Sequence, residues 1–240
     1  MEALVNGAAK ILNSLQKSTG RFIYGGPDGG WGTTNQDVIY PLALLYKSRH
    51  PKNPYYGDRR VLEATLLGGD CIRAFQYEDG RVEFLKPDGS RWGPTYMPWT
   101  MYHWLETYGL LKPELEGGRA EAWYKGLTLA VNGIKKELET APVHNIPTWN
   151  GMSLYRAGQL FGREDLLEAG RGMIYRAVEG QDSRGFWPEH KGPTTHYNLV
   201  YVHAIGLYYE FSQDGKVLDC LRRALDFHIT FTYPDGTPVE

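Results

Sequence analysis

The sequence predicts an all-α protein, an (α/α) toroid of antiparallel helical hairpins that forms an incomplete ring of about nine helices. One observation behind this prediction is a repeat, because a Gly or Pro followed by Thr precedes an apolar helix four times, about fifty residues apart. The other is that amphipathic helices alternate with helices that are apolar almost all round, as expected for outer and buried inner helices. We therefore expect one toroid domain over residues 1–240.

The repeat is marked by four threonines and by turn-forming triplets. The threonines are Thr34, Thr95, Thr148 and Thr194. Pro-Asp-Gly turns at 27–29 and 87–89 lead toward the first two of them, and a third turn at 234–236 lies near the last residue. The spacing suits a helical hairpin with its loops, so the chain is expected to break off within a repeat and to continue beyond Glu240.

The outer helices are predicted from one-sided apolar stripes. In the first of them, Leu4, Ala8, Ile11, Leu12 and Leu15 fall on one face. The predicted outer helices span residues 2–18, 58–77, 113–139, 163–179 and 216–230. Between the second outer helix and the next inner helix, residues 78–93 alternate enough to form a short β-hairpin.

The inner helices are predicted from their lack of a polar face. They span residues 34–46, 96–108, 148–162 and 192–211. Thr34 can cap the first of them with Asp37 reaching back as a capping box, and Gly162 suits the end of the third. His103 and His203 lie among apolar residues and are expected to be hydrogen-bonded core residues.

The links between helices are unequal in length. Links from an inner to an outer helix, such as Gly162-Arg163 and residues 212–215, are mostly short, whereas the opposite links are long and rich in Gly, Pro and Trp. If consecutive helices are antiparallel, the long loops, their β-hairpins and the N-termini of the inner helices gather at one end. A functional site is expected there, because loops on a rigid scaffold carry chemistry and helix N-termini favour anions.

Composition gives few hints of a partner. The formal net charge of −2 offers no bulk attraction for nucleic acid, and no apolar run approaches the roughly 20 residues of a membrane span. Cys71 and Cys220 have neither metal-ligand nor disulfide spacing and are expected to be small buried side chains. Residues 1–17 resemble an amphipathic helix, not a signal peptide, which predicts a cytoplasmic protein if this N-terminus is native.

Two polar motifs lie in the predicted loops, and they carry a resemblance to a known family. The first is His144-Asn145 before the third inner helix, and the second runs from Glu189 through Pro193 to His196-Tyr197 at the start of the fourth. This arrangement resembles the heparinase II/III-like and alginate-lyase-like polysaccharide lyases, although the order within both pairs is reversed here. The resemblance covers roughly residues 140–211 and implies cleavage of a uronic-acid-containing glycan by β-elimination, with no cofactor and no metal.

The chemistry of such an elimination suits these residues. Removing a proton beside a carboxylate builds up a second negative charge, which neutral donors such as Asn145 and His144 can stabilise. A tyrosine can act as base and acid if a neighbouring histidine lowers its pKa, so Tyr197 beside His196 is the candidate. Residues expected to bind the acidic sugar chain by stacking, charge or hydrogen bonding are Trp31, Trp99, Trp149, Trp187, Arg184, Lys191 and Glu189.

Two other functions fit the same sequence. A glycoside hydrolase on the same toroid would use a pair of carboxylates chosen from Asp28, Asp37, Asp88 and Glu189. A non-catalytic carbohydrate-binding module, alone or as a homodimer, would use the aromatic side chains without turnover. Fold alone does not decide among these functions.

Overall fold

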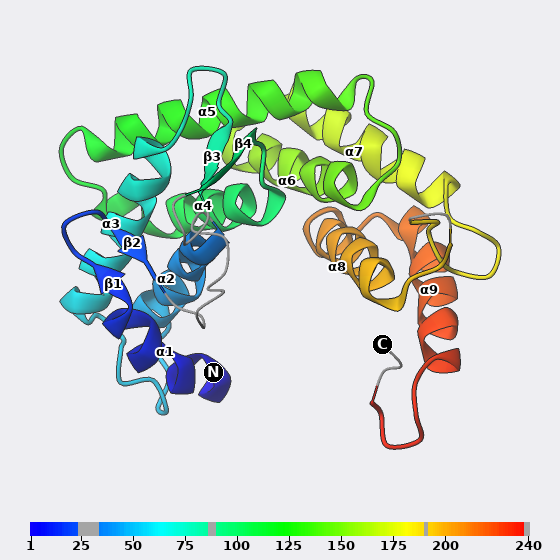
Figure 1. Ribbon diagram of the computed structural model, residues 1–240, viewed down its shortest axis with the longest axis horizontal. Coiled ribbons are helices and arrows are strands. Elements are labelled where there is room, and N and C mark those ends of the chain that lie inside the picture. The colour runs from blue at the N-terminus through cyan, green and yellow to red at the C-terminus, as the bar shows by residue number, and fades with distance from the viewer. Residues whose placement is uncertain (24–33, 86–89, 190–191, 238–240) are drawn as a thin grey trace. The chain divides into compact units, whose positions relative to one another are not determined.

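The computed structural model describes residues 1–23, 34–85, 90–189 and 192–237 (Figure 1). It is mostly helical, at 67%, with nine α-helices and two small antiparallel sheets of two strands each in the described residues. The predicted all-α class is therefore confirmed. The chain divides into two compact units, Met1–Gly133 and Ile134–Glu240. Each unit is described by itself, and the arrangement of the helices in an incomplete toroidal ring stays a prediction.

The first unit contains four helices and the greater part of a fifth. The α-helices are α1 (Glu2–Asn13), α2 (Ile39–Lys47), α3 (Arg59–Ala74), α4 (Pro98–Leu111) and α5 (Arg119–Leu138), of which α5 runs across the division. Two short 3-10 helices, η1 (Thr34–Val38) and η2 (Lys112–Glu114), precede α2 and follow α4. Helix α2 packs against α1, α3 and α4. Its apolar residues Ile39, Leu42 and Leu45 are buried, so the inner position predicted for this helix is confirmed.

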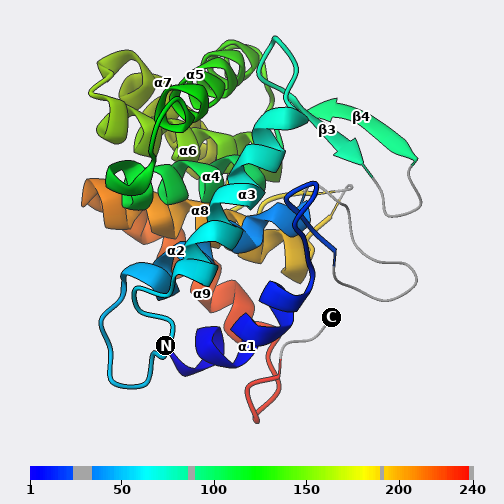
Figure 2. The ribbon, with the colours of Figure 1, turned by 90° about the vertical axis from the view of Figure 1, so that its left-hand side faces the viewer.

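Two short hairpins interrupt the helices of the first unit. Strand β1 (Leu15–Gln16) pairs antiparallel with β2 (Arg21–Phe22), so the first helix ends at Asn13 and does not reach the predicted Ser18. Strand β3 (Val82–Leu85) pairs with β4 (Arg91–Thr95), which confirms the hairpin predicted from residues 78–93, whereas the β1–β2 pair was not predicted. Figure 2 shows that this hairpin extends away from α3.

The second unit consists of two helical hairpins. Helices α6 (Asn145–Phe161) and α7 (Glu164–Glu179) form one, and α8 (Thr195–Ser212) and α9 (Leu218–Thr230), joined through η3 (Gly215–Val217), form the other. Helix α6 packs against both α7 and α8 (Figure 1). Helices α6 and α7 approach closely at Gly170, where an added Cβ would lie 2.5 Å from the Gly151 carbonyl oxygen and from the Tyr155 nitrogen. Gly170 therefore sets how near the two helices can pack.

Several helix starts differ from the predicted ones. Helix α6 begins at Asn145, so Thr148 lies inside the helix and its hydroxyl donates to the His144 carbonyl oxygen at 2.8 Å. Thr95 ends strand β4, and α4 starts at Pro98, whose missing N–H suits a first helical position. The predicted end of α6 is confirmed, because Gly162 adopts the left-handed conformation with φ 64°.

Both cysteines are buried and neither forms a disulfide, as expected. Burial raises the pKa of the Cys71 thiol to about 11 and that of Cys220 to about 12. In the described parts of the chain, no helix combines the length and the apolar character that a membrane span needs.

Candidate functional site

Glu189 is a buried carboxylate of the second unit with several polar partners. It lies in the loop between α7 and α8, and its side chain is only 1% exposed. Its oxygen Oε1 accepts hydrogen bonds from the Asn145 backbone N–H (3.1 Å), the Asn145 side-chain amide (3.2 Å) and the Tyr201 hydroxyl (2.7 Å). The other oxygen, Oε2, lies 2.9 Å from His144 Nε2. Three hydrogen bonds and the contact with His144 thus hold a buried carboxylate in one orientation.

His144 is the member of this cluster that meets solvent. It is the residue that precedes α6, and its side chain is 44% exposed. A carboxylate accepts only, so Nε2 of His144 carries the proton that faces Glu189. In the neutral ring, Nδ1 is then the nitrogen that can take up a proton from another molecule. The arrangement is that of an imidazole oriented by a carboxylate for proton transfer.

Asn145 is buried and hydrogen-bonded to Glu189. The residue is 3% exposed, and both its backbone N–H and its side-chain amide are used on Glu189. In this conformation the amide holds the carboxylate and does not point outward to a ligand. The structure therefore places Asn145 as a support for Glu189, whereas the sequence suggested direct contact with the substrate.

Tyr201 and Tyr197 occupy one face of α8, one turn apart. Burial and donation to Glu189 hold the pKa of Tyr201 far above the usual range of tyrosine, so its hydroxyl is unsuited to lose a proton. Tyr197 is partly exposed in the first turn of α8, and the ring of exposed His196 meets it edge-on at 5.8 Å. Side chains four residues apart have Cβ atoms about 5–6 Å apart, which puts Tyr197 next to the Glu189 cluster.

The N-termini of two helices border the same cluster. His144 precedes α6, and Thr194 precedes α8 without a side-chain cap on the helix. Backbone N–H groups in a first helical turn have no partner within the helix, and the helix dipole makes this end positive. An anionic group would therefore be stabilised beside His144 and Tyr197.

Two of the predicted stacking tryptophans face inward. Trp187 is 1% exposed, its ring stacks on Tyr201 with centroids 4.7 Å apart, and its indole N–H donates to the Ala177 carbonyl oxygen at 2.7 Å. Trp149 is also 1% exposed and packs edge-on against His203 at 5.0 Å. Neither indole offers an open face to a sugar ring, because each is covered by its own unit.

The other predicted binding residues are placed less centrally. Arg184 pairs with Asp182 at 2.9 Å, lies over the Phe186 ring, and lowers the pKa of Asp182 to about 2. Trp99 is partly exposed on α4 of the first unit. Predicted residues that lie outside the described parts of the chain are Trp31, Lys191, Asp28 and Asp88.

The first unit holds a second carboxylate and histidine. Asp37 accepts a hydrogen bond from Thr100 of α4 at 2.8 Å, and its other oxygen lies 3.9 Å from His103 Nδ1. Tyr40 stacks on the His103 ring with centroids 5.7 Å apart. Burial raises the pKa of Asp37, against the lowering effect of His103 and Thr100. His103 is thus part of a polar cluster, although the sequence suggested a core residue.

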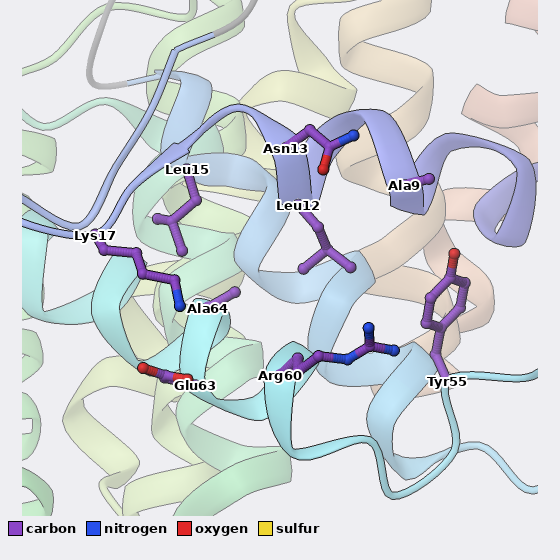
Figure 3. A pocket seen from close by; sticks show the side chains of 9 residues that line it. All are labelled: Ala9, Leu12, Asn13, Leu15, Lys17, Tyr55, Arg60, Glu63 and Ala64. Carbon is purple, nitrogen blue, oxygen red and sulfur yellow. The ribbon is translucent and has the colours of Figure 1, made fainter.

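A separate pocket of about 330 Å³ lies between α1 and α3 (Figure 3). It is lined by the apolar side chains of Leu12, Leu15 and Ala64 together with charged side chains such as those of Lys17 and Arg60. None of the predicted site residues lines it. In the described residues no group of three or more His, Cys, Asp or Glu side chains could hold a metal ion.

Comparisons with known proteins leave the family open. No protein-family model matches the chain, and no curated protein matches it. The function therefore rests on the chemistry of the two clusters.

Proposed function

We propose that the protein is a carbohydrate-active lyase that cleaves a uronic-acid-containing glycan by β-elimination at the His144–Glu189 site. The observation that carries the proposal is a half-exposed imidazole held at 2.9 Å by a buried carboxylate. This pair lies beside a partly exposed tyrosine and two helix N-termini. Together they supply a proton acceptor, a proton donor and stabilisation of negative charge.

Each group has a role in the reaction. The uronate carboxylate lies toward the N-termini of α6 and α8, where the charge that develops at its α-carbon is stabilised. His144 Nδ1 removes the proton from C5, and Glu189 stabilises the imidazolium that forms. The bond from C4 to the glycosidic oxygen breaks as the C4–C5 double bond forms, and the Tyr197 hydroxyl gives its proton to the leaving oxygen. The proton on His144 then returns to Tyr197 through solvent.

This assignment refines the one suggested by the sequence. Tyr197 was the expected base, but the orientation of His144 by Glu189 favours the imidazole as the acceptor. Asn145, which was expected to contact the substrate, supports Glu189 instead. The buried Tyr201 hydroxyl is excluded as the proton donor to substrate because it already donates its hydrogen bond to Glu189.

The proposal is tested with a panel of uronate polymers: alginate, heparan and chondroitin types, and glucuronan. Elimination creates a conjugated double bond, so ultraviolet absorbance rises with the cleaved polymer. Tyr197→Phe should reduce the rate by about a hundredfold or more, because it removes the proton donor. Tyr56→Phe, at an exposed tyrosine of the first unit, is the matched control and should keep the rate. No absorbance with any polymer would overturn the proposal.

A glycoside hydrolase is the second candidate, and Asp37 is the observation that favours it. A carboxyl group whose pKa is raised by burial can act as a general acid. Under this alternative, sugar reducing ends appear without ultraviolet absorbance, and Asp37→Asn abolishes them. A carbohydrate-binding module would instead retain polymer with no new reducing ends in any variant.

A further inference from the structure

Asn198 of α8 joins three segments of the second unit and is 0% exposed. Its Oδ1 accepts from the Trp187 backbone N–H at 3.1 Å, and its Nδ2 donates to the Gly185 carbonyl oxygen at 3.4 Å. The same Nδ2 lies 3.1 Å from Nε2 of His228 on α9. Asn198 therefore fixes the turn that leads into Glu189 against both helices of the second hairpin.

The turn held by Asn198 is built tightly. Asp182 and Phe186 share a backbone hydrogen bond of 2.9 Å, and Gly185 has φ 92°. A Cβ at Gly185 would come within 2.0 Å of the Arg223 carbonyl oxygen on α9, so only glycine fits there. Trp187 directly follows this turn, and its ring stacks on Tyr201.

The protonation state of His228 follows from its partner. An amide nitrogen donates only, so His228 Nε2 must accept and the ring must be neutral, with its proton on Nδ1. Burial lowers the pKa of His228 from the usual 6.5. The charged groups around it are committed to other partners or to solvent. Asp182 and Arg184 in the turn pair with each other, Arg223 bonds Gln181, and Asp226 is exposed.

We propose that Asn198 and His228 are positioning residues of the candidate site, and that protonation of His228 releases the Trp187 turn and with it the geometry of His144. Neutral His228 keeps Asn198 Nδ2 directed at α9 and Oδ1 directed at Trp187. When the His228 ring is protonated, its Nε2–H faces the Asn198 NH₂ group, and two donors cannot bond to each other. Asn198 can accept from this N–H only if its side-chain amide rotates by about half a turn, so that Oδ1 faces His228. That rotation takes the acceptor away from the Trp187 N–H.

The effect reaches His144 through contacts already described. Trp187 stacks on Tyr201 at an interplanar angle of 7°, Tyr201 donates to Glu189, and Glu189 orients His144. Each step is a direct contact between side chains that are at most 3% exposed, up to His144 itself. This inference rests on the proposed role of His144 in catalysis, but its structural part does not need a substrate.

Hydrogen exchange of the Trp187 indole and backbone N–H groups, measured between pH 4 and 8 and corrected for intrinsic exchange, tests the structural part. His228→Leu removes the acceptor and should lower protection about tenfold at neutral pH. His228→Gln keeps an acceptor that does not titrate. This variant should therefore retain the protection of Trp187 at neutral pH and keep it as the pH is lowered. The wild type should lose protection as the pH falls through the lowered pKa of His228, below 6.5. His50→Gln, at an exposed histidine of the first unit, is the matched control.

Turnover is then measured on the same variants. His228→Gln should be active to lower pH than the wild type, and His228→Leu should lose turnover at every pH. Unchanged Trp187 protection in His228→Leu, or the same acid dependence in His228→Gln as in the wild type, would overturn the positioning role. If the exchange results are as predicted but no polymer is cleaved, the proposed function is wrong, while the role of Asn198 and His228 in positioning the Trp187 turn is supported.

Discussion

Each of the two units contains a carboxylate beside a histidine, and the two pairs differ in almost every other respect. Glu189 is 1% exposed, accepts from three donors of Asn145 and Tyr201, and lies 2.9 Å from His144. Asp37 is 22% exposed, accepts from Thr100 alone among the bonds of the described residues, and lies 3.9 Å from His103. The nitrogen and oxygen of the first pair are within contact distance, whereas those of the second lie 1.0 Å farther apart, at 3.9 Å against 2.9 Å.

The difference lies in how each carboxylate is compensated for its burial. Burying a charged oxygen costs free energy unless donors replace the lost water. Glu189 accepts three hydrogen bonds and contacts His144. Asp37 accepts one hydrogen bond within the described residues, from Thr100, and burial raises its pKa from the usual value. Burial of a carboxylate is thus compensated by more donors in the second unit than in the first.

The largest expected difference is between removing the two carboxylates. Glu189→Ala leaves three buried donors without their acceptor, removes the contact with His144, and should destabilise the second unit by about 3 kcal/mol. Asp37→Ala should cost less than about 1 kcal/mol, because its pair with His103 is long and partly exposed. Urea unfolding followed by hydrogen exchange in each unit measures both. Equal losses of stability in Glu189→Ala and Asp37→Ala would contradict the difference between the two pairs.

A smaller difference is expected when one hydroxyl donor is removed from each carboxylate. Tyr201→Phe leaves Glu189 with the two Asn145 donors and should cost about 1 kcal/mol, with some loss of order at His144. Thr100→Val takes away the hydroxyl that Asp37 accepts from and should raise the pKa of Asp37 further, with little change in stability. Thermal unfolding and a carboxyl titration by NMR test the two variants. A larger stability loss from Thr100→Val than from Tyr201→Phe would contradict the comparison.

The smallest effect is a pH dependence in the first unit. Because the folded pKa of Asp37 is above the unfolded value of 3.8, the folded state holds the proton more tightly, and stability falls as pH rises from 3.8 through the folded pKa. Asp37→Asn removes this loss and should make stability flatter with pH in that window. Unfolding midpoints of the wild type and the variant, compared across the window, measure the effect. If the unfolding midpoint of the wild type rises relative to that of Asp37→Asn as the pH increases, the predicted direction of the effect is wrong.

The fold and part of the site follow from local signals in the sequence. Apolar periodicity located the nine helices, and Gly162 marked the end of α6 because a left-handed residue there favours glycine. The gathering of long loops predicted that the motif at His144 and the loop at Glu189 would belong together, and the structure joins them at 2.9 Å.

The remaining features depend on tertiary packing and have no local signal. Trp187 and Trp149 occur in loop-like or helix-start sequence, yet both rings turn inward, and the sequence does not encode which way a ring at such a position faces. Tyr201 was not singled out as a site residue, although its spacing of four from Tyr197 was a usable sign of a shared helix face. Asn198 and His228 were not singled out, because their contact links two helices thirty residues apart in the chain.

We expect His144, and not His103 of the first unit, to carry the chemistry. The most direct measurement is the ultraviolet absorbance of uronate polymers incubated with the wild type, His144→Gln and His103→Gln. We predict that absorbance rises with at least one polymer, falls by about a hundredfold or more in His144→Gln, and is nearly unchanged in His103→Gln. Equal activity of His144→Gln and the wild type, or a loss confined to His103→Gln, would contradict the account.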